Sequence, residues 1–99
     1  MAIAEVSVVP LGTKTASVSQ YVARAVKVLE GEKGLKYEIT AMGTIVEGEL
    51  DRILAAVKKM HEATFGEGVA RVLTTVKIDD RRDKAQGMKE KVDSVRKKL

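Results

Sequence analysis

Few side chains in this sequence could carry out catalysis. The 99 residues contain no cysteine, and His61 is the only histidine. A general base needs a partner that positions it, and a metal ion needs several ligands. Glu62 follows His61 directly, but consecutive residues of a helix point in different directions. We therefore expect no metal site, no cofactor and no catalytic residue, and we expect that the protein is not an enzyme.

Residues 11–15 could bind an anion. This stretch reads Leu-Gly-Thr-Lys-Thr and precedes a predicted helix start. Free backbone N–H groups and the positive end of a helix dipole attract phosphate or sulfate, and Lys14 adds a positive charge. The spacing matches neither a Walker loop nor a dinucleotide fingerprint. Lys14 is thus a candidate anion-binding residue, and an ordinary connecting loop is the alternative.

Alternating and helical patterns place these residues in a series of strands and helices. The predicted strands are residues 3–10, 37–42, 44–47 and 69–78. One helix is expected to start at a capping box formed by Ser17 and Gln20, and a second to start at Glu49. Pro10 is expected to end the first strand, and Gly43 to allow the turn between the second and third strands.

The order of these elements predicts the fold class. It is βαββαβ, which is the order of an α+β ferredoxin-like sandwich. Right-handed crossovers then place both helices on one face of a four-stranded antiparallel sheet. The predicted buried residues of the two helices are Val18, Val22, Ala25, Val26 and Leu29, and Leu50, Ile53, Leu54, Val57 and Met60. The inward residues of the second and fourth strands are expected to be Tyr37, Ile39 and Ala41, and Val72, Thr74, Val76 and Ile78.

We expect one domain, with residues 1–80 forming the ferredoxin-like domain and residues 81–99 a C-terminal helical extension of it. Met88, Val92, Val95 and Leu99 recur at helical spacing in the extension. This narrow apolar stripe is expected to dock on its own domain or on a neighbouring subunit. The face of the sheet away from the helices is too polar for a core, and it is a candidate surface for subunit packing or a ligand.

Positive charge is concentrated near the C-terminus. Residues 79–99 hold eight basic and five acidic residues, within a formal net charge of +4. RNA-binding domains of this fold stack bases on aromatic side chains of the central strands, whereas Tyr21, Tyr37 and Phe65 lie elsewhere. We therefore expect no nucleic-acid partner and interpret the segment as a solvated helix surface.

Other features of the composition suggest where the protein works. No stretch approaches the roughly 20 apolar residues of a membrane span, and the N-terminus lacks a secretory signal. We expect a cytoplasmic protein with no membrane partner. The absence of asparagine and the abundance of lysine and glutamate are typical of thermophiles.

Four segments resemble the thiamine-binding (YkoF-like) protein family. They are residues 8–12 (Val-Val-Pro-Leu-Gly), 17–22 (Ser-Val-Ser-Gln-Tyr-Val), 42–48 (Met-Gly-Thr-Ile-Val-Glu-Gly) and 74–83 (Thr-Thr-Val-Lys-Ile-Asp-Asp-Arg-Arg-Asp). The resemblance covers nearly the whole chain in the family's order. It implies a ferredoxin-like domain, a homo-oligomer (dimer or tetramer) assembled through its sheets, and binding of thiamine or its hydroxymethylpyrimidine moiety without catalysis.

Thiamine carries an aminopyrimidine with hydrogen-bonding groups, a positively charged thiazolium and two flat rings. On the resemblance, the candidate ligand-binding residues are Ser7, Ser17, Thr40, Met42, Thr44 and Glu47. The hydroxyls of Ser7, Thr40 and Thr44 supply polar partners, and Met42 supplies a polarisable surface. Glu47 supplies negative charge, with Glu38 and Glu5 as alternatives. Each also has a plain structural interpretation, such as a helix cap for Ser17.

Two other functions stay open on the sequence. A regulatory or assembly module of this fold would act mainly through a protein partner. A small hydrolase resembling acylphosphatases would need an asparagine, and an arginine in the first loop. The chain contains no asparagine, and residues 11–16 contain no arginine.

Overall fold

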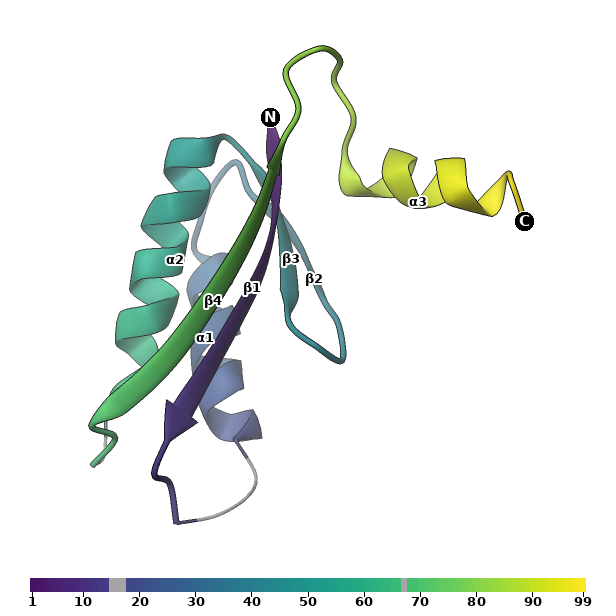
Figure 1. The fold of residues 1–99 in the computed structure, drawn as a ribbon. Helices are drawn as coiled ribbons and strands as arrows, with labels where there is room; N and C mark the ends of the chain where they lie inside the picture. The colour runs from purple at the N-terminus through teal and green to yellow at the C-terminus, as the bar shows by residue number, and fades with distance from the viewer. Residues whose placement is uncertain (15–17, 67) are drawn as a thin grey trace.

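The computed structural model describes residues 1–14, 18–66 and 68–99 (Figure 1). Its elements are β1 (Ala2–Leu11), α1 (Ser19–Glu30), β2 (Lys36–Ile39), β3 (Thr44–Gly48), α2 (Leu50–Thr64), β4 (Arg71–Asp80) and α3 (Met88–Arg96). The strands form one antiparallel sheet in the order β2-β3-β1-β4. Helices α1 and α2 lie on one face of this sheet. The predicted α+β ferredoxin-like fold is thus confirmed.

The core lies between the sheet and these two helices. Alternate residues of a strand point to opposite faces, so the even-numbered side chains of β1 from Ala2 to Val8 face the helices and are buried. The helices contribute Ala25, Leu29, Ile53, Ala56 and Met60 to the same cluster. Fully burying a side chain of the size of Leu29, Ile53 or Met60 stabilises the fold by roughly 1.5–3 kcal/mol. The core therefore fixes which face of β1 the helices cover.

Pairing on the two sides of β1 is unequal. Strand β4 pairs with its whole length, from Ala2 opposite Asp80 to Leu11 opposite Arg71. Strand β3 pairs only with residues 2–6, where Val6 lies opposite Thr44. The prediction that Pro10 ends the strand is wrong, because β1 continues to Leu11. Proline is tolerated in a strand where one side has no neighbour, and β1 has none beyond Val6 on its β3 side.

The β2–β3 hairpin is shorter than predicted. Strand β2 ends at Ile39, so Thr40 and Met42 belong to the turn instead of the strand. Ile39 was expected to face inward, but it is 63% exposed, and Ala41 is exposed as well. The reason is that β2 is an edge strand of four residues, and Ile39 borders an open pocket instead of the packed core.

Two other apolar residues are also more exposed than expected. The buried stripe of α2 is centred on Ile53 and Met60, and Leu54, which lies about 100° further around the helix axis, is exposed. Ile78 is exposed near the end of β4, which is the other edge strand. Helix α1 begins at Ser19 with Val18 at its N-cap position, one residue later than the proposed capping box requires. Ser17 itself lies outside the described residues.

Helix α3 starts beside the sheet and projects away from it (Figure 1). Its apolar stripe does not dock on its own domain as one alternative predicted, because Val92, Val95 and Leu99 are 48%, 61% and 97% exposed. The few contacts that hold the helix lie near its first turn, since its later residues find no surface of the same chain to cover. Docking on a neighbouring subunit stays a prediction. None of the helices in the described part of the chain is long and apolar enough to cross a membrane.

Only glycine fits at position 43, because the hairpin turn lies very close to the backbone of β1. A Cβ atom at this position would lie 2.9 Å from the carbonyl oxygen of Val6. Replacement Gly43→Ala is therefore expected to lower the free energy of unfolding by about 1–3 kcal/mol, the usual cost of overpacking. Urea denaturation followed by circular dichroism measures this value.

The matched control for this test is Gly31→Ala. Gly31 has a helical backbone, and the nearest atom to its added Cβ would be 3.8 Å away. We expect this variant to unfold within about 0.5 kcal/mol of the parent protein. Equal stability of the two variants would show that the hairpin does not press against β1.

Candidate functional site

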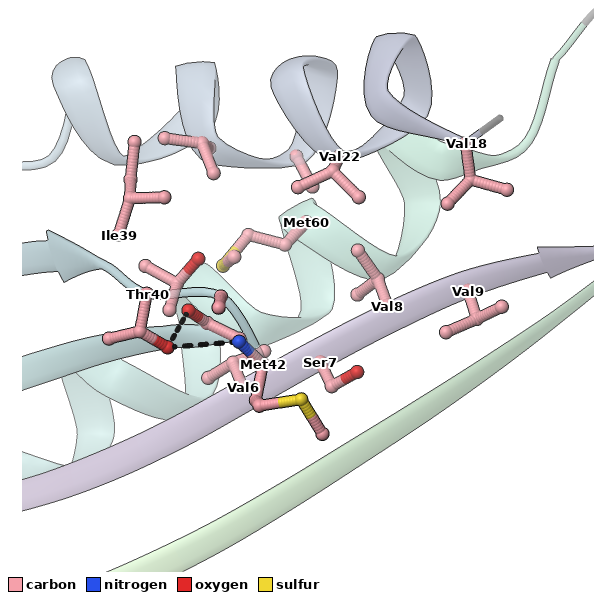
Figure 2. Close-up of a pocket in the computed structure, with 15 residues that line it drawn as sticks. Val6, Ser7, Val8, Val9, Val18, Val22, Ile39, Thr40, Met42 and Met60 are labelled. Atoms are coloured by element: carbon pink, nitrogen blue, oxygen red, sulfur yellow. Dashed lines mark hydrogen bonds between the residues drawn. The ribbon is translucent and has the colours of Figure 1, made fainter. Parts of the chain in front are cut away.

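A pocket of about 180 Å³ lies between α1, the β2–β3 turn and the edge of β1 (Figure 2). Four of the predicted ligand-binding residues line it, namely Ser7, Thr40, Met42 and Thr44. Most of the other lining side chains are apolar: Val6, Val8, Val9, Val18, Val22, Ala25, Val26, Ile39, Ala41 and Met60. The structure therefore brings these four polar or polarisable candidates together around an apolar hollow.

The pocket reaches both faces of the sheet at the edge of β1. Val6 and Val8 point toward the helices, whereas Ser7 and Val9 point to the other face, and all four line the pocket. This is possible because β3 does not continue alongside this part of β1. The half-buried Ser7 hydroxyl and the buried Thr44 side chain are consequently on opposite faces.

Thr40 holds the hairpin turn together. Its hydroxyl donates a hydrogen bond to the Gly43 carbonyl oxygen at 2.7 Å and accepts one from the Met42 backbone N–H at 3.3 Å (Figure 2). A hydroxyl has a single hydrogen to donate, so Thr40 can offer a ligand only its remaining acceptor capacity. Met42 is 82% exposed and extends away from α1, which places it at the mouth of the pocket.

Glu47 does not line this pocket. Its side chain is only 8% exposed, and its Oε2 atom accepts a hydrogen bond of 3.3 Å from the backbone N–H of Met88. Glu90 accepts a second bond, of 3.1 Å, from the backbone N–H of Gly87. Carboxylates at a helix start satisfy free N–H groups and complement the helix dipole. Glu47 therefore serves as a cap for α3, across 41 positions of the sequence.

Of the two alternative acids, Glu5 lies nearer the pocket. A Cβ atom at Gly43, which lines the pocket, would be 3.5 Å from Cγ of Glu5. Glu5 is exposed and points to the open face of the sheet, as does Glu38 on β2. Glu5 can therefore place negative charge near the mouth of the pocket, where this charge would attract a cation bound just outside the hollow.

Lys14 lies apart from these residues. It is exposed and borders a second hollow, of about 370 Å³, together with Gly12, Thr13, Gln20, Tyr21, Gly68 and Val69. Its role as an anion-binding residue stays a prediction. The remaining candidate, Ser17, falls outside the part of the chain that the structure describes.

His61 has structural partners. Its Nδ1 atom lies 2.6 Å from the Thr74 hydroxyl oxygen, and its ring meets Phe65 edge to face at a centroid distance of 5.3 Å. These contacts tie the end of α2 to β4. Within residues 1–14, 18–66 and 68–99, no group of three His, Cys, Asp or Glu side chains is arranged to hold a metal ion.

The segment between β4 and α3 carries local ion pairs. Arg81 contacts Asp83 at 2.6 Å and Arg82 contacts Asp80 at 2.9 Å. The hydrogen bond from Arg82 is the main cause that lowers the pKa of the Asp80 carboxyl. Both guanidinium groups are thus engaged by carboxylates next to them, which leaves them less free to bind an external anion.

Sequence reasoning did not predict the apolar walls of the pocket as a binding surface. Val22 was assigned to the core, yet it is half-buried and lines the hollow. A usable signal was present in Pro10, because a proline inside a strand indicates that one side of that strand lacks a partner. That unpaired side is the side that the pocket occupies.

Comparisons with known proteins agree on one family. The family model described as thiamine-binding protein matches residues 4–96. The UPF0045 protein YqgV of Bacillus subtilis is 49% identical over 100% of this chain and 98% of its own length. A UPF0045 protein of Methanothermobacter thermautotrophicus is 50% identical over the full length of both chains.

A solved structure has the same fold. The hypothetical protein MJ1052 of Methanocaldococcus jannaschii superimposes with a TM-score of 0.87 and 45% sequence identity. The match covers 95% of this chain and 94% of that one. The arrangement of strands and helices described above is therefore shared with a relative that was solved independently.

Loss of the Glu47 carboxylate is expected to loosen α3 specifically. In Glu47→Ala the backbone N–H of Met88 loses its acceptor, and loss of a helix cap costs about 0.5–2 kcal/mol. Amide hydrogen exchange should therefore accelerate in α3, for example at Lys91, whose N–H bonds to the Gly87 carbonyl. The control Glu49→Ala removes an exposed carboxylate that makes no side-chain cap bond to α2. Similar exchange in α3 for both variants would contradict the capping role.

Proposed function

The chain belongs to the thiamine-binding protein family, and we propose that it binds thiamine or its hydroxymethylpyrimidine moiety without catalysing a reaction. The observation that carries this proposal is the pocket beside β1. It joins hydroxyl groups and a strand edge to apolar walls, which is the combination that a flat polar heterocycle requires.

The size of the pocket favours one ring over the whole molecule. Pockets for drug-sized ligands usually measure about 300–1,000 Å³, and this hollow measures about 180 Å³. The pyrimidine enters the hollow, and the thiazolium stays at its mouth between Met42 and Glu5. A thioether makes favourable contacts with an aromatic ring, and the Glu5 carboxylate complements the thiazolium charge.

The lining residues support binding without catalysis. Ser7, Thr40 and Thr44 carry hydroxyl groups, but among the described residues that line the pocket there is no histidine, lysine, aspartate or glutamate that could activate them. His61, the only histidine of the chain, bonds to Thr74 instead. The proposed role is thus that of a carrier, buffer or sensor.

A homo-oligomer of two or four subunits is part of this proposal. Three apolar side chains are more than half exposed: Leu73 on the open face of the sheet, and Val95 and Leu99 in the C-terminal extension. Burying apolar surface of this kind between subunits would stabilise a small domain. The same surfaces support the second candidate function, a regulatory or assembly module with a protein partner.

A variant with a larger side chain in the pocket tests whether the pocket is the binding site. Isothermal titration calorimetry of dialysed protein with hydroxymethylpyrimidine is expected to show saturable binding near one ligand per subunit. Val22→Phe places a larger side chain in the hollow and should weaken this affinity by at least about tenfold, which corresponds to ~1.4 kcal/mol. The control Val92→Phe makes the same change on exposed α3 and should leave the affinity unchanged. Equal affinities for both variants would place the ligand elsewhere.

The charge at the mouth can be tested by comparing two ligands. Glu5→Gln is expected to weaken thiamine binding about two- to fivefold, the usual range for an exposed charge pair, and to leave hydroxymethylpyrimidine binding unchanged. Glu62→Gln removes an exposed acid from α2 and serves as the control. Weaker binding of both ligands by Glu5→Gln would contradict the proposed orientation, because the pyrimidine carries no positive charge at neutral pH.

A further inference from the structure

The unpaired side of β1 can be located residue by residue. Pairing of β1 with β3 and with β4 is regular along both ladders, without a bulge. In a regular antiparallel strand, the N–H and C=O of one residue point to the same side, and successive residues alternate. One residue of known direction therefore fixes the direction of all the others.

Val6 provides that reference. Its carbonyl oxygen would be 2.9 Å from a Cβ atom at Gly43, so its backbone groups point toward β3. By alternation, the backbone groups of Val8 and Pro10 point to the same side, whereas those of Val9 point to β4. Pro10 agrees with this assignment, because the residue without an N–H falls where no strand would accept it.

The N–H and C=O of Val8 therefore face the pocket. Strand β3 begins at Thr44, opposite Val6, so it does not run beside Val8, and Val8 lines the hollow there. The residue as a whole is 6% exposed, and buried backbone groups without partners are costly. A ligand that pairs with them gains affinity from groups that Ala2, Ala4 and Val6 use to pair with β3.

We propose that the backbone N–H and C=O of Val8 are the recognition edge of this site, and that they bind an amino-substituted nitrogen heterocycle in the plane of the sheet. The proposal rests on the proposed function and assigns its specificity. A ring nitrogen accepts from the N–H of Val8, and the adjacent exocyclic amino group donates to its C=O. This is the hydrogen-bond pattern by which an added strand recognises a sheet edge, here reduced to one residue. Val22 and Ile39 then line the space beside the ring.

Replacing a single backbone N–H by an ester oxygen tests this assignment with the side chain preserved. The protein is made by chemical synthesis with an ester at Val8, and its affinity for hydroxymethylpyrimidine is measured by calorimetry. We expect the ester to weaken binding at least about tenfold and to lower the melting temperature less than the control does. An ester at Ile3 is the matched control, because it removes an N–H that points to β4 and leaves the Val8 carbonyl as an amide. It should lower the melting temperature and leave the affinity unchanged.

A ligand analogue with CH in place of the accepting ring nitrogen completes the test. It should bind the parent protein at least about tenfold more weakly, and the ester at Val8 should weaken it no further, since both changes remove the same hydrogen bond. Full affinity of the Val8 ester for the pyrimidine would overturn the recognition edge and leave the proposed function standing. Absence of pyrimidine binding by the parent protein would overturn the proposed function and this assignment together.

Discussion

Unequal pairing on the two sides of β1 is the constraint on which the other features depend. Strand β4 accompanies β1 over ten residues, whereas the β2–β3 hairpin accompanies it over five and then turns back at Gly43. The turn lies so close to β1 that only glycine fits. Beyond it, one side of β1 has no strand, and the gap between this edge and α1 becomes the pocket. If β3 were two residues longer at its start, its backbone would form hydrogen bonds with Val8 and the gap would be closed.

The two ends of strand β3 have different roles, one at the pocket and one at the start of α3. Its first residue, Thr44, lies at the pocket, and the carboxylate near its other end, Glu47, holds the start of α3. The acid that the sequence offers most plainly for a cationic ligand is thus engaged in positioning a helix. Glu5, on the neighbouring strand and beside the hairpin, is left to supply charge at the pocket.

Much of the fold can be predicted from the sequence, because it depends on local patterns. Alternation in β1 and helical spacing around Ile53 and Met60 identify the elements, their order and most of the core. The four residues that meet at the pocket were predicted through the family resemblance. The role of Glu47 could not be predicted, since its partner Met88 lies 41 residues away and nothing local connects them. Exposure of Ile39 likewise depends on how far a neighbouring strand extends, which its own alternation does not encode.

The longest ladder of the sheet joins the first strand of the chain to the last. Ala2 pairs with Asp80, so a nascent chain emerging from the ribosome presents β1 long before β4 exists. Until then one whole edge of the central strand has no partner, and an open edge next to apolar side chains invites pairing with other chains. Contacts between distant parts of a sequence also form slowly. Protein synthesis that stops before β4 would therefore yield a fragment prone to aggregation, whereas a fragment lacking only α3 would retain the complete sheet.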